Sequence, residues 1–166
     1  MNYAKIKHFD IANGEGVRTS LFVSGCQFHC EDCFNSETWD YNYGNLYTKE
    51  TENHILSTLQ DRYIDGLSIL GGDPLWQDED GIAQLTKLVE QVKSIGKTVW
   101  IWSGFTWEQL PSLSASKQNL IKLCDVMIDG LYNKTLRDLR LKWRGSSNQR
   151  VINIQQSIKE GKVIEV

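Results

Sequence analysis

Three of the four cysteines of this chain lie within one stretch of eight residues, where they can act together. Cys26, Cys30 and Cys33 have the spacing C-x3-C-x2-C. Spacing this short lets a single loop surround one metal centre, and thiolates are common ligands of iron–sulfur clusters and of zinc. In a chain expected to stay in a reducing compartment, such a cluster of cysteines indicates metal binding rather than disulfides.

The number of thiolates favours one kind of metal centre over another. A structural zinc site normally takes four ligands in two close pairs, and no second pair is present because Cys124 stands alone far along the chain. His29 lies inside the loop, but its neighbour Cys30 makes joint ligation awkward. Three thiolates suit a four-iron cluster with one iron left open for chemistry. The spacing therefore favours a cluster, with a zinc site and unliganded core thiols as the alternatives.

Polar residues also follow three apolar runs further along the chain. The runs end at Gly71-Gly72-Asp73, Ser103-Gly104 and Asp129-Gly130, and a fourth run ends at Gly25-Cys26. If these runs are parallel strands, all four turns lie at the same edge of a sheet, where ligands bind in such folds. The turns and the cysteine loop are therefore predicted to form one site.

The patterns between these turns predict strands that alternate with helices. The predicted strands are Arg18–Ser24, Leu67–Leu70, Thr98–Trp102 and Asp125–Ile128, with two further short ones at Val151–Ile154 and Val163–Val166. The predicted helices are Thr48–Leu59, Asp78–Lys97 and Thr106–Cys124, the last interrupted near Pro111. This alternation predicts an α/β fold whose parallel strands are joined by helical crossovers.

The bulk composition predicts a globular protein with one domain over residues 1–166. Hydrophobic residues make up 40% of the 166 residues and charged residues 23%, which separates the chain from disordered proteins. A net charge of −3 gives no reason to expect nucleic acid or a membrane as partner. No stretch has the length of a membrane span, and the N-terminus lacks the apolar core of a signal peptide, so a cytoplasmic location is expected.

Two motifs together resemble those of the radical S-adenosylmethionine superfamily. They are the cysteine motif directly after a strand and Gly71-Gly72-Asp73-Pro74 at the end of the next strand. Over nearly the full length, the chain further resembles the glycyl radical activases of anaerobic ribonucleoside-triphosphate reductases. The matching stretches are Asn13–Arg18, Leu21–Trp39, Gly71–Leu75, Trp100–Leu110, Asp125–Tyr132 and Trp143–Arg150. The last of these, WRGSSNQR, is the most specific mark of that branch.

The resemblance implies a fold, two cofactors and a reaction. The fold is a small incomplete (β/α) barrel of parallel strands, and the cofactors are a [4Fe-4S] cluster with three cysteine ligands and S-adenosyl-L-methionine. The implied enzyme is an oxidoreductase that cleaves S-adenosylmethionine reductively. The resulting 5′-deoxyadenosyl radical takes a hydrogen atom from the large subunit of the anaerobic reductase and leaves a glycyl radical there. An external one-electron donor, such as a flavodoxin, supplies the electron.

The resemblance also implies which residues hold the two cofactors, and none of them is expected to act as an acid or base. The cluster ligands are Cys26, Cys30 and Cys33. The methionyl amino group is received by Gly71, Gly72 and Asp73. The adenosyl part contacts the backbone of Asp32, Cys33 and Phe34. Ser103 and Asp129 hydrogen-bond the carboxylate and the ribose, while Arg144 and Arg150 neutralise the carboxylate or contribute to a docking face.

The chain departs from the family pattern at four positions, two of which, Phe34 and Phe105, keep an aromatic ring where the family commonly has Tyr. Glu15 stands where the family usually has Pro, and Asp32 where it usually has Gly. The alternatives within the superfamily are an activase of another glycyl radical enzyme and a small-molecule radical enzyme, and Trp143–Arg150 argues against both. An alternative of another class is a zinc-binding adaptor without catalysis.

Overall fold

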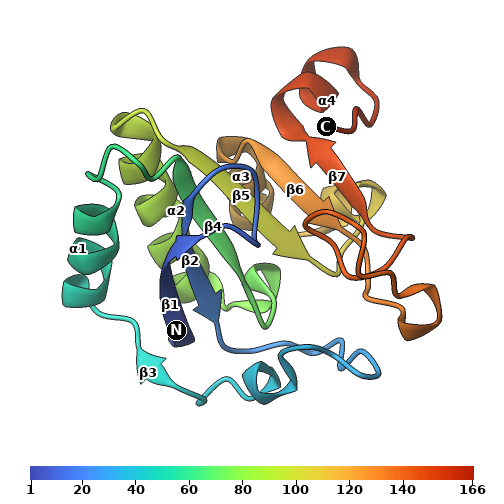
Figure 1. Cartoon of the computed structure of the whole chain (residues 1–166), viewed down its shortest axis with the longest axis horizontal. Helices are drawn as coiled ribbons and strands as arrows, with labels where there is room; N and C mark the ends of the chain where they lie inside the picture. The colour runs from blue at the N-terminus through green and yellow to red at the C-terminus, as the bar shows by residue number, and fades with distance from the viewer.

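Seven strands form a single sheet in the computed structural model, which describes residues 1–166 (Figure 1). The strands are β1 (Asn2–Asp10), β2 (Arg18–Val23), β3 (Asn45–Leu46), β4 (Gly66–Gly71), β5 (Thr98–Ser103), β6 (Val126–Asp129) and β7 (Arg150–Asn153). They are ordered β3-β1-β2-β4-β5-β6-β7. The four central strands, β2, β4, β5 and β6, pair in parallel, while β1, β3 and β7 pair antiparallel at the two edges.

Helices connect the parallel strands and cover one face of the sheet. The α-helices are α1 (Lys49–Thr58), α2 (Glu79–Ser94), α3 (Ala115–Leu123) and α4 (Ile154–Glu160), and short 3-10 helices are η1 (Ser36–Trp39), η2 (Pro74–Trp76), η3 (Trp107–Ser112) and η4 (Lys134–Leu136). Side-chain caps fix where two of the helices begin: Asp78 accepts a hydrogen bond from Gly81 N at the start of α2, and Thr48 forms a capping box at the start of α1.

Alternate residues of the strands enter two different cores. Odd-numbered residues such as Leu21, Ile69 and Ile101 pack against α1, α2 and α3 in the main core of 22 buried residues. Even-numbered residues, among them Trp100 and Ile128, face the other side and form a smaller core with Val126, Val151 and the partly buried Trp102 and Trp143. No helix of the main core packs on this second face. It is left open for loops and for the candidate site.

A buried arginine fixes the N-terminal ends of the central strands. Arg18 is 1% exposed and donates to Ser68 Oγ at 2.7 Å, to the Leu67 carbonyl at 2.8 Å and to the Thr98 carbonyl at 3.1 Å. No carboxylate pairs with it, and burial lowers the pKa of the guanidinium to about 10. Asn13, in the same family-like stretch, accepts from Ser68 Oγ through its carbonyl. This stretch therefore anchors the N-terminal loop on the open face of the sheet.

The main α/β arrangement is confirmed, whereas the predicted C-terminal strand is wrong. Val163–Val166 forms only an isolated bridge between Glu165 and Ile152, because after α4 the chain returns along the edge of β7 with few backbone bonds. Strands β1 and β3 and helix α4 were not expected from the sequence.

The strand pairing shows an open sheet with β3 and β7 at its edges, and the incomplete barrel stays a prediction. None of the helices is long and apolar enough to cross a membrane.

Candidate functional site

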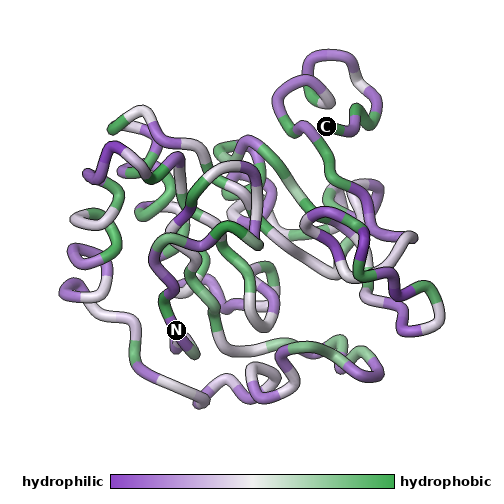
Figure 2. Tube along the Cα trace, viewed as in Figure 1, coloured by the Kyte–Doolittle hydropathy of each residue, from purple (hydrophilic) through white to green (hydrophobic).

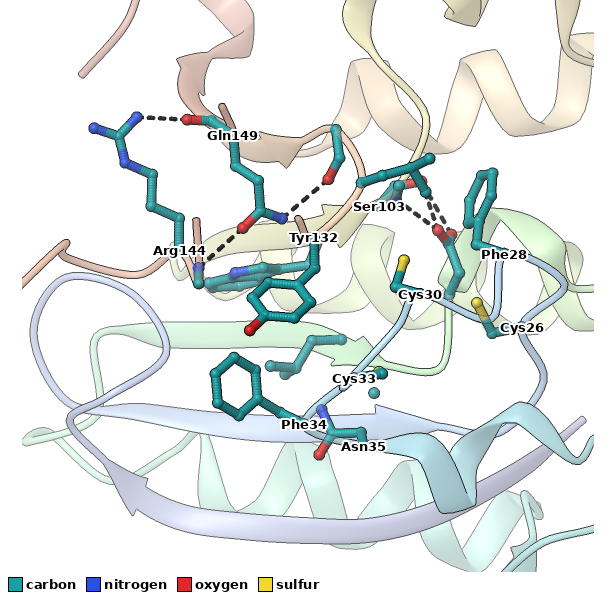
Figure 3. Close-up of a pocket in the computed structure, with 18 of the residues that line it drawn as sticks. Cys26, Phe28, Cys30, Cys33, Phe34, Asn35, Ser103, Tyr132, Arg144 and Gln149 are labelled. Atoms are coloured by element: carbon teal, nitrogen blue, oxygen red, sulfur yellow. Dashed lines mark hydrogen bonds between the residues drawn. The ribbon is translucent and has the colours of Figure 1, made fainter. Parts of the chain in front are cut away.

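A cavity of about 460 Å³ lies at the carboxyl ends of the four parallel strands (Figure 3). Three parts of the chain meet in it: the cysteine loop, the turns after β4, β5 and β6, and the connection between β6 and β7. Its lining includes Cys26, Cys30, Cys33, Gly71, Gly72, Asp73, Ser103, Gly104 and Gly130. Because β2, β4, β5 and β6 run in parallel, the predicted meeting of their terminal turns at one edge is confirmed.

The three cysteines are free thiols, and Figure 3 shows the sulfur atoms of Cys26 and Cys30 in the cavity. Cys26 is buried, and Cys30 and Cys33 are half-buried. Burial raises the pKa of the Cys26 thiol to about 11, and burial together with the nearby Cys33 raises the pKa of Cys30. A positive partner would favour the thiolates of Cys26 and Cys30, and bound metal supplies such charge.

The three cysteines come from one loop and line one cavity, and three is the number of thiolates that hold a four-iron cluster with one iron left open. In a four-iron cluster each thiolate binds a different iron, so the ligands surround a wider centre. The backbone of the cysteine loop is left-handed at two residues, His29 (φ 49°) and Asp32 (φ 56°). The donor set of three thiolates from one loop therefore fits an iron–sulfur cluster.

The glycines after β4 make room for the cysteine loop itself. A β-carbon on Gly72 would lie 2.5 Å from the Gly25 carbonyl oxygen and 2.8 Å from that of Thr38. Gly72 N donates to the Val23 carbonyl at 2.8 Å, and Asp73 N donates to the Gly25 carbonyl at 2.9 Å. Gly25 precedes Cys26 directly. The close approach that glycine permits here is therefore between the turn and the backbone that positions the first cysteine.

Asp73 joins the turns after β4 and β5. Its carboxylate is 1% exposed and accepts from Leu75 N at 2.8 Å, from Gly104 N at 2.7 Å and from Ser103 Oγ at 3.0 Å. Burial raises the pKa of this carboxyl to about 6 although these bonds favour its charged form. Both Asp73 and Ser103 line the cavity, yet their polar atoms are committed to each other and to backbone. Their observed contacts hold the cavity wall in place.

The segment from Trp143 to Gln149 forms the opposite wall of the cavity. Gln149 Oε1 accepts from Gly145 N at 2.9 Å and from Ser146 N at 3.2 Å, and Gln149 Nε2 donates to the Gly130 carbonyl at 3.0 Å. Trp143 accepts a bond from Trp102 Nε1 at 2.8 Å through its carbonyl. One glutamine thus shapes the loop and ties it to the end of β6.

Comparison with known proteins places the chain in a family. The model of the 4Fe-4S single cluster domain matches residues 12–152. A relative named anaerobic ribonucleoside-triphosphate reductase-activating protein occurs in Escherichia coli K12 and is 39% identical over 159 residues, which cover 93% of this chain and 100% of the relative. A relative of the same name in enterobacteria phage T4 is 41% identical over 152 residues, which cover 91% of this chain and 93% of the relative. A relative of the same name in Vibrio cholerae is 40% identical over 153 residues, covering 90% of this chain and 96% of the relative. The chain belongs to the family of anaerobic ribonucleoside-triphosphate reductase-activating proteins.

Asp32, the residue before Cys33, lies outside the cavity lining. Its backbone is left-handed, with φ 56°, which is the conformation that glycine adopts most easily. Its carboxylate is exposed and lies 3.7 Å from Lys134 Nζ. The neighbours Cys33 and Phe34 do line the cavity. The predicted contact of Asp32 with the adenosyl part therefore concerns only its backbone, and it stays a prediction.

Asp32→Gly is expected to stabilise the metal-free protein by about 0.5–1 kcal/mol, because glycine relieves the left-handed strain. Asp32→Ala is the matched control, since it removes the same carboxylate but keeps the β-carbon. Urea unfolding of both variants measures the difference. If Asp32→Ala raises the free energy of unfolding as much as Asp32→Gly does, the carboxylate and not the left-handed backbone destabilises the protein at this position.

Asp129 and Arg150 lie beside the main cavity rather than in its lining. Asp129 is 1% exposed and accepts from Arg150 Nε at 3.0 Å and from Trp107 N at 2.8 Å. Arg150 also pairs with Glu108 at 2.8 Å, and this pairing lowers the pKa of Glu108 to about 2. These residues line a second, polar hollow next to the first. Their contacts connect β6, β7 and η3. The predicted contact of Asp129 with a cofactor stays a prediction.

Arg150→Ala is expected to lower the free energy of unfolding by about 2 kcal/mol, because the buried carboxylate of Asp129 loses its charged partner. Glu108→Ala removes only the exposed partner and should cost less than about 0.5 kcal/mol. Thermal and urea unfolding of the two variants test this ranking. Equal losses would contradict the structural role given to the Arg150–Asp129 pair.

Two features of the site were not expected from the sequence. Gln149 was not singled out because glutamine in a loop carries no spacing signal, although it lies within the family motif. Phe34 packs against Tyr132 at a ring-centroid distance of 5.1 Å, and both line the cavity. Only the fold brings these two rings together, because they come from separate loops.

Proposed function

We propose that this chain activates an anaerobic ribonucleoside-triphosphate reductase by forming a glycyl radical on its large subunit. The observation that carries the proposal is the single cavity that brings together the three cysteines, the Gly-Gly-Asp turn and the Trp143–Gln149 loop. Relatives about 40% identical over nearly their full length carry the activating-protein name. These findings agree on an iron–sulfur activase.

When bound, a [4Fe-4S] cluster and S-adenosylmethionine would supply the radical chemistry: one electron would go into cleavage of S-adenosylmethionine, methionine would leave, and the hydrogen atom lost by a reductase glycine would end on 5′-deoxyadenosine. The chain itself supplies binding and geometry. Cys26, Cys30 and Cys33 would hold the cluster and leave one iron free for the methionyl group.

The walls of the cavity suit S-adenosylmethionine. A volume of about 460 Å³ lies within the usual range for small-molecule sites. Gly71 and Gly72 would offer backbone groups to the methionyl group, and Asp73 with Ser103 would keep that edge rigid. The aromatic rings of Phe34 and Tyr132 would cover the adenosyl part and exclude water.

Further parts of the proposal concern the setting of the enzyme. The electron would come from an external one-electron donor such as a flavodoxin. Residues 1–166 would work as one domain of the incomplete-barrel type in the cytoplasm, where thiols stay reduced.

Anaerobic reconstitution of the full chain tests this function. About four irons and four sulfides per chain are expected. Reduction with dithionite in the presence of S-adenosylmethionine should then release methionine and 5′-deoxyadenosine in equal amounts. Stoichiometric zinc without iron uptake, or a cluster that never yields deoxyadenosine, would contradict the proposal.

A further inference from the structure

The connection between β6 and β7 projects at the mouth of the cavity as a small hairpin. Its base is held by a bridge between Arg137 and Ser146 and by a 2.9 Å bond from Ser147 N to the Leu136 carbonyl. Residues 139–142 form its tip, and Figure 2 shows hydrophobic and hydrophilic residues alternating in this connection. At this tip Leu139, Arg140 and Lys142 are exposed, whereas Leu141 is half-buried and lines the cavity.

Large apolar side chains are exposed around this mouth. Leu139 is 80% exposed although it lines the cavity. Leu131 and Leu136, from the same connection, are 44% and 41% exposed, and Phe34 of the cysteine loop is 56% exposed. A group of exposed apolar side chains at the edge of a site indicates a surface that a partner covers.

The same segment is basic in an acidic protein. Between residues 131 and 144 there are five Lys or Arg and a single Asp, whereas the whole chain has a net charge of −3. Arg140 pairs with Asp138. Arg137 and Lys142 form no ion pair with any carboxylate of the chain and lie instead near the rings of Phe34 and Trp143, at 5.0 and 5.9 Å. These two cations are therefore free for acidic groups of a partner.

We propose that the reductase docks on this surface, the docking rim, through a segment that carries acidic and apolar side chains and leads into the cavity. The docking rim consists of Phe34, Leu131, Leu136, Leu139, Arg137 and Lys142. This inference rests on the proposed function and adds the surface and the chemistry of contact. Lys134 lies beside the rim but already pairs with the carboxylates of Glu31 and Asp32, so it is not one of the free cations of the rim.

Binding of reconstituted full-length protein to its cognate reductase, measured anaerobically by calorimetry, tests the rim. The double variant Leu136→Gln/Lys142→Glu is expected to weaken binding about tenfold or more, because one apolar contact and one charge contact are lost. Lys142→Glu alone should also reduce the dependence of Kd on salt, an effect that a structural role would not produce. Leu46→Gln and Lys162→Glu are matched controls, since Leu46 is 65% exposed on β3 and Lys162 is exposed beyond α4. Iron content and Tm establish that each variant folds.

The outcomes separate the rim from the proposed function. If the wild-type protein binds the reductase and the double variant binds it equally well, the docking rim is overturned and the activase function stands. Loss of affinity for single-stranded DNA or anionic vesicles, with reductase binding unchanged, would also overturn it. If the wild-type protein shows no binding to the reductase, both the rim and the activase function fail.

Discussion

Replacing any one of Cys26, Cys30 or Cys33 by Ala is expected to reduce the iron content after anaerobic reconstitution from about four per chain to near zero. Two thiolates cannot hold three corners of a cluster, and burial, which raises the pKa of the Cys26 thiol, works against forming a thiolate without bound metal. Iron and sulfide analysis with absorption spectra gives the result directly.

Cys124→Ala is the matched control for the three cysteine variants. Cys124 is fully buried in the main core, and its thiol donates to the Leu120 carbonyl at 3.3 Å. We expect this variant to lose about 1 kcal/mol of stability and to keep its full iron content. Normal cluster assembly in Cys26→Ala, or loss of the cluster in Cys124→Ala, would contradict the assignment of the ligands.

Gly72→Ala should also prevent normal cluster assembly, although Gly72 is not a ligand of the cluster. Its new methyl group would lie 2.5 Å from the Gly25 carbonyl oxygen, so the backbone before Cys26 must move. Overpacking against backbone costs about 1–3 kcal/mol, and we expect reduced iron uptake together with a lower Tm. The two are measured on the same preparation.

Gly161→Ala is the control that carries a methyl group into open space. Gly161 has φ 66° with nothing within 4 Å of an added β-carbon, so the substitution costs only the backbone strain of about 1–2 kcal/mol. It should retain its iron. If Gly72→Ala assembles the cluster as well as Gly161→Ala does, the turn after β4 does not position the cysteine loop.

The sequence predicted the parts of the fold that depend on periodicity. The helix predicted at Asp78–Lys97 is α2 (Glu79–Ser94), because its apolar residues recur at helical spacing and its start is capped. Strand β1 was missed because Lys5, Lys7 and His8 leave it without a continuous apolar run. The short strand β3 has two exposed residues and no pattern to detect.

The candidate site was predictable where it follows from strand ends and not where it depends on side-chain direction. The cysteine loop and the Gly-Gly-Asp turn meet as expected, since the parallel order fixes their edge. Asp129 instead turns toward Trp107, on the side of the sheet that Met127 also faces, because alternate residues of a strand point to opposite faces. Gln149 acts through loop backbone, which only the folded chain reveals.

The most direct test of the central claim is electron paramagnetic resonance of the reductase after activation. Reconstituted, reduced protein is mixed anaerobically with S-adenosylmethionine and its cognate reductase, and the radical signal and 5′-deoxyadenosine are quantified together. We predict a glycyl radical signal on the reductase, matched by an equal amount of deoxyadenosine and absent with Cys30→Ala. An intact cluster that cleaves S-adenosylmethionine but yields no glycyl radical on the reductase would contradict the activase function.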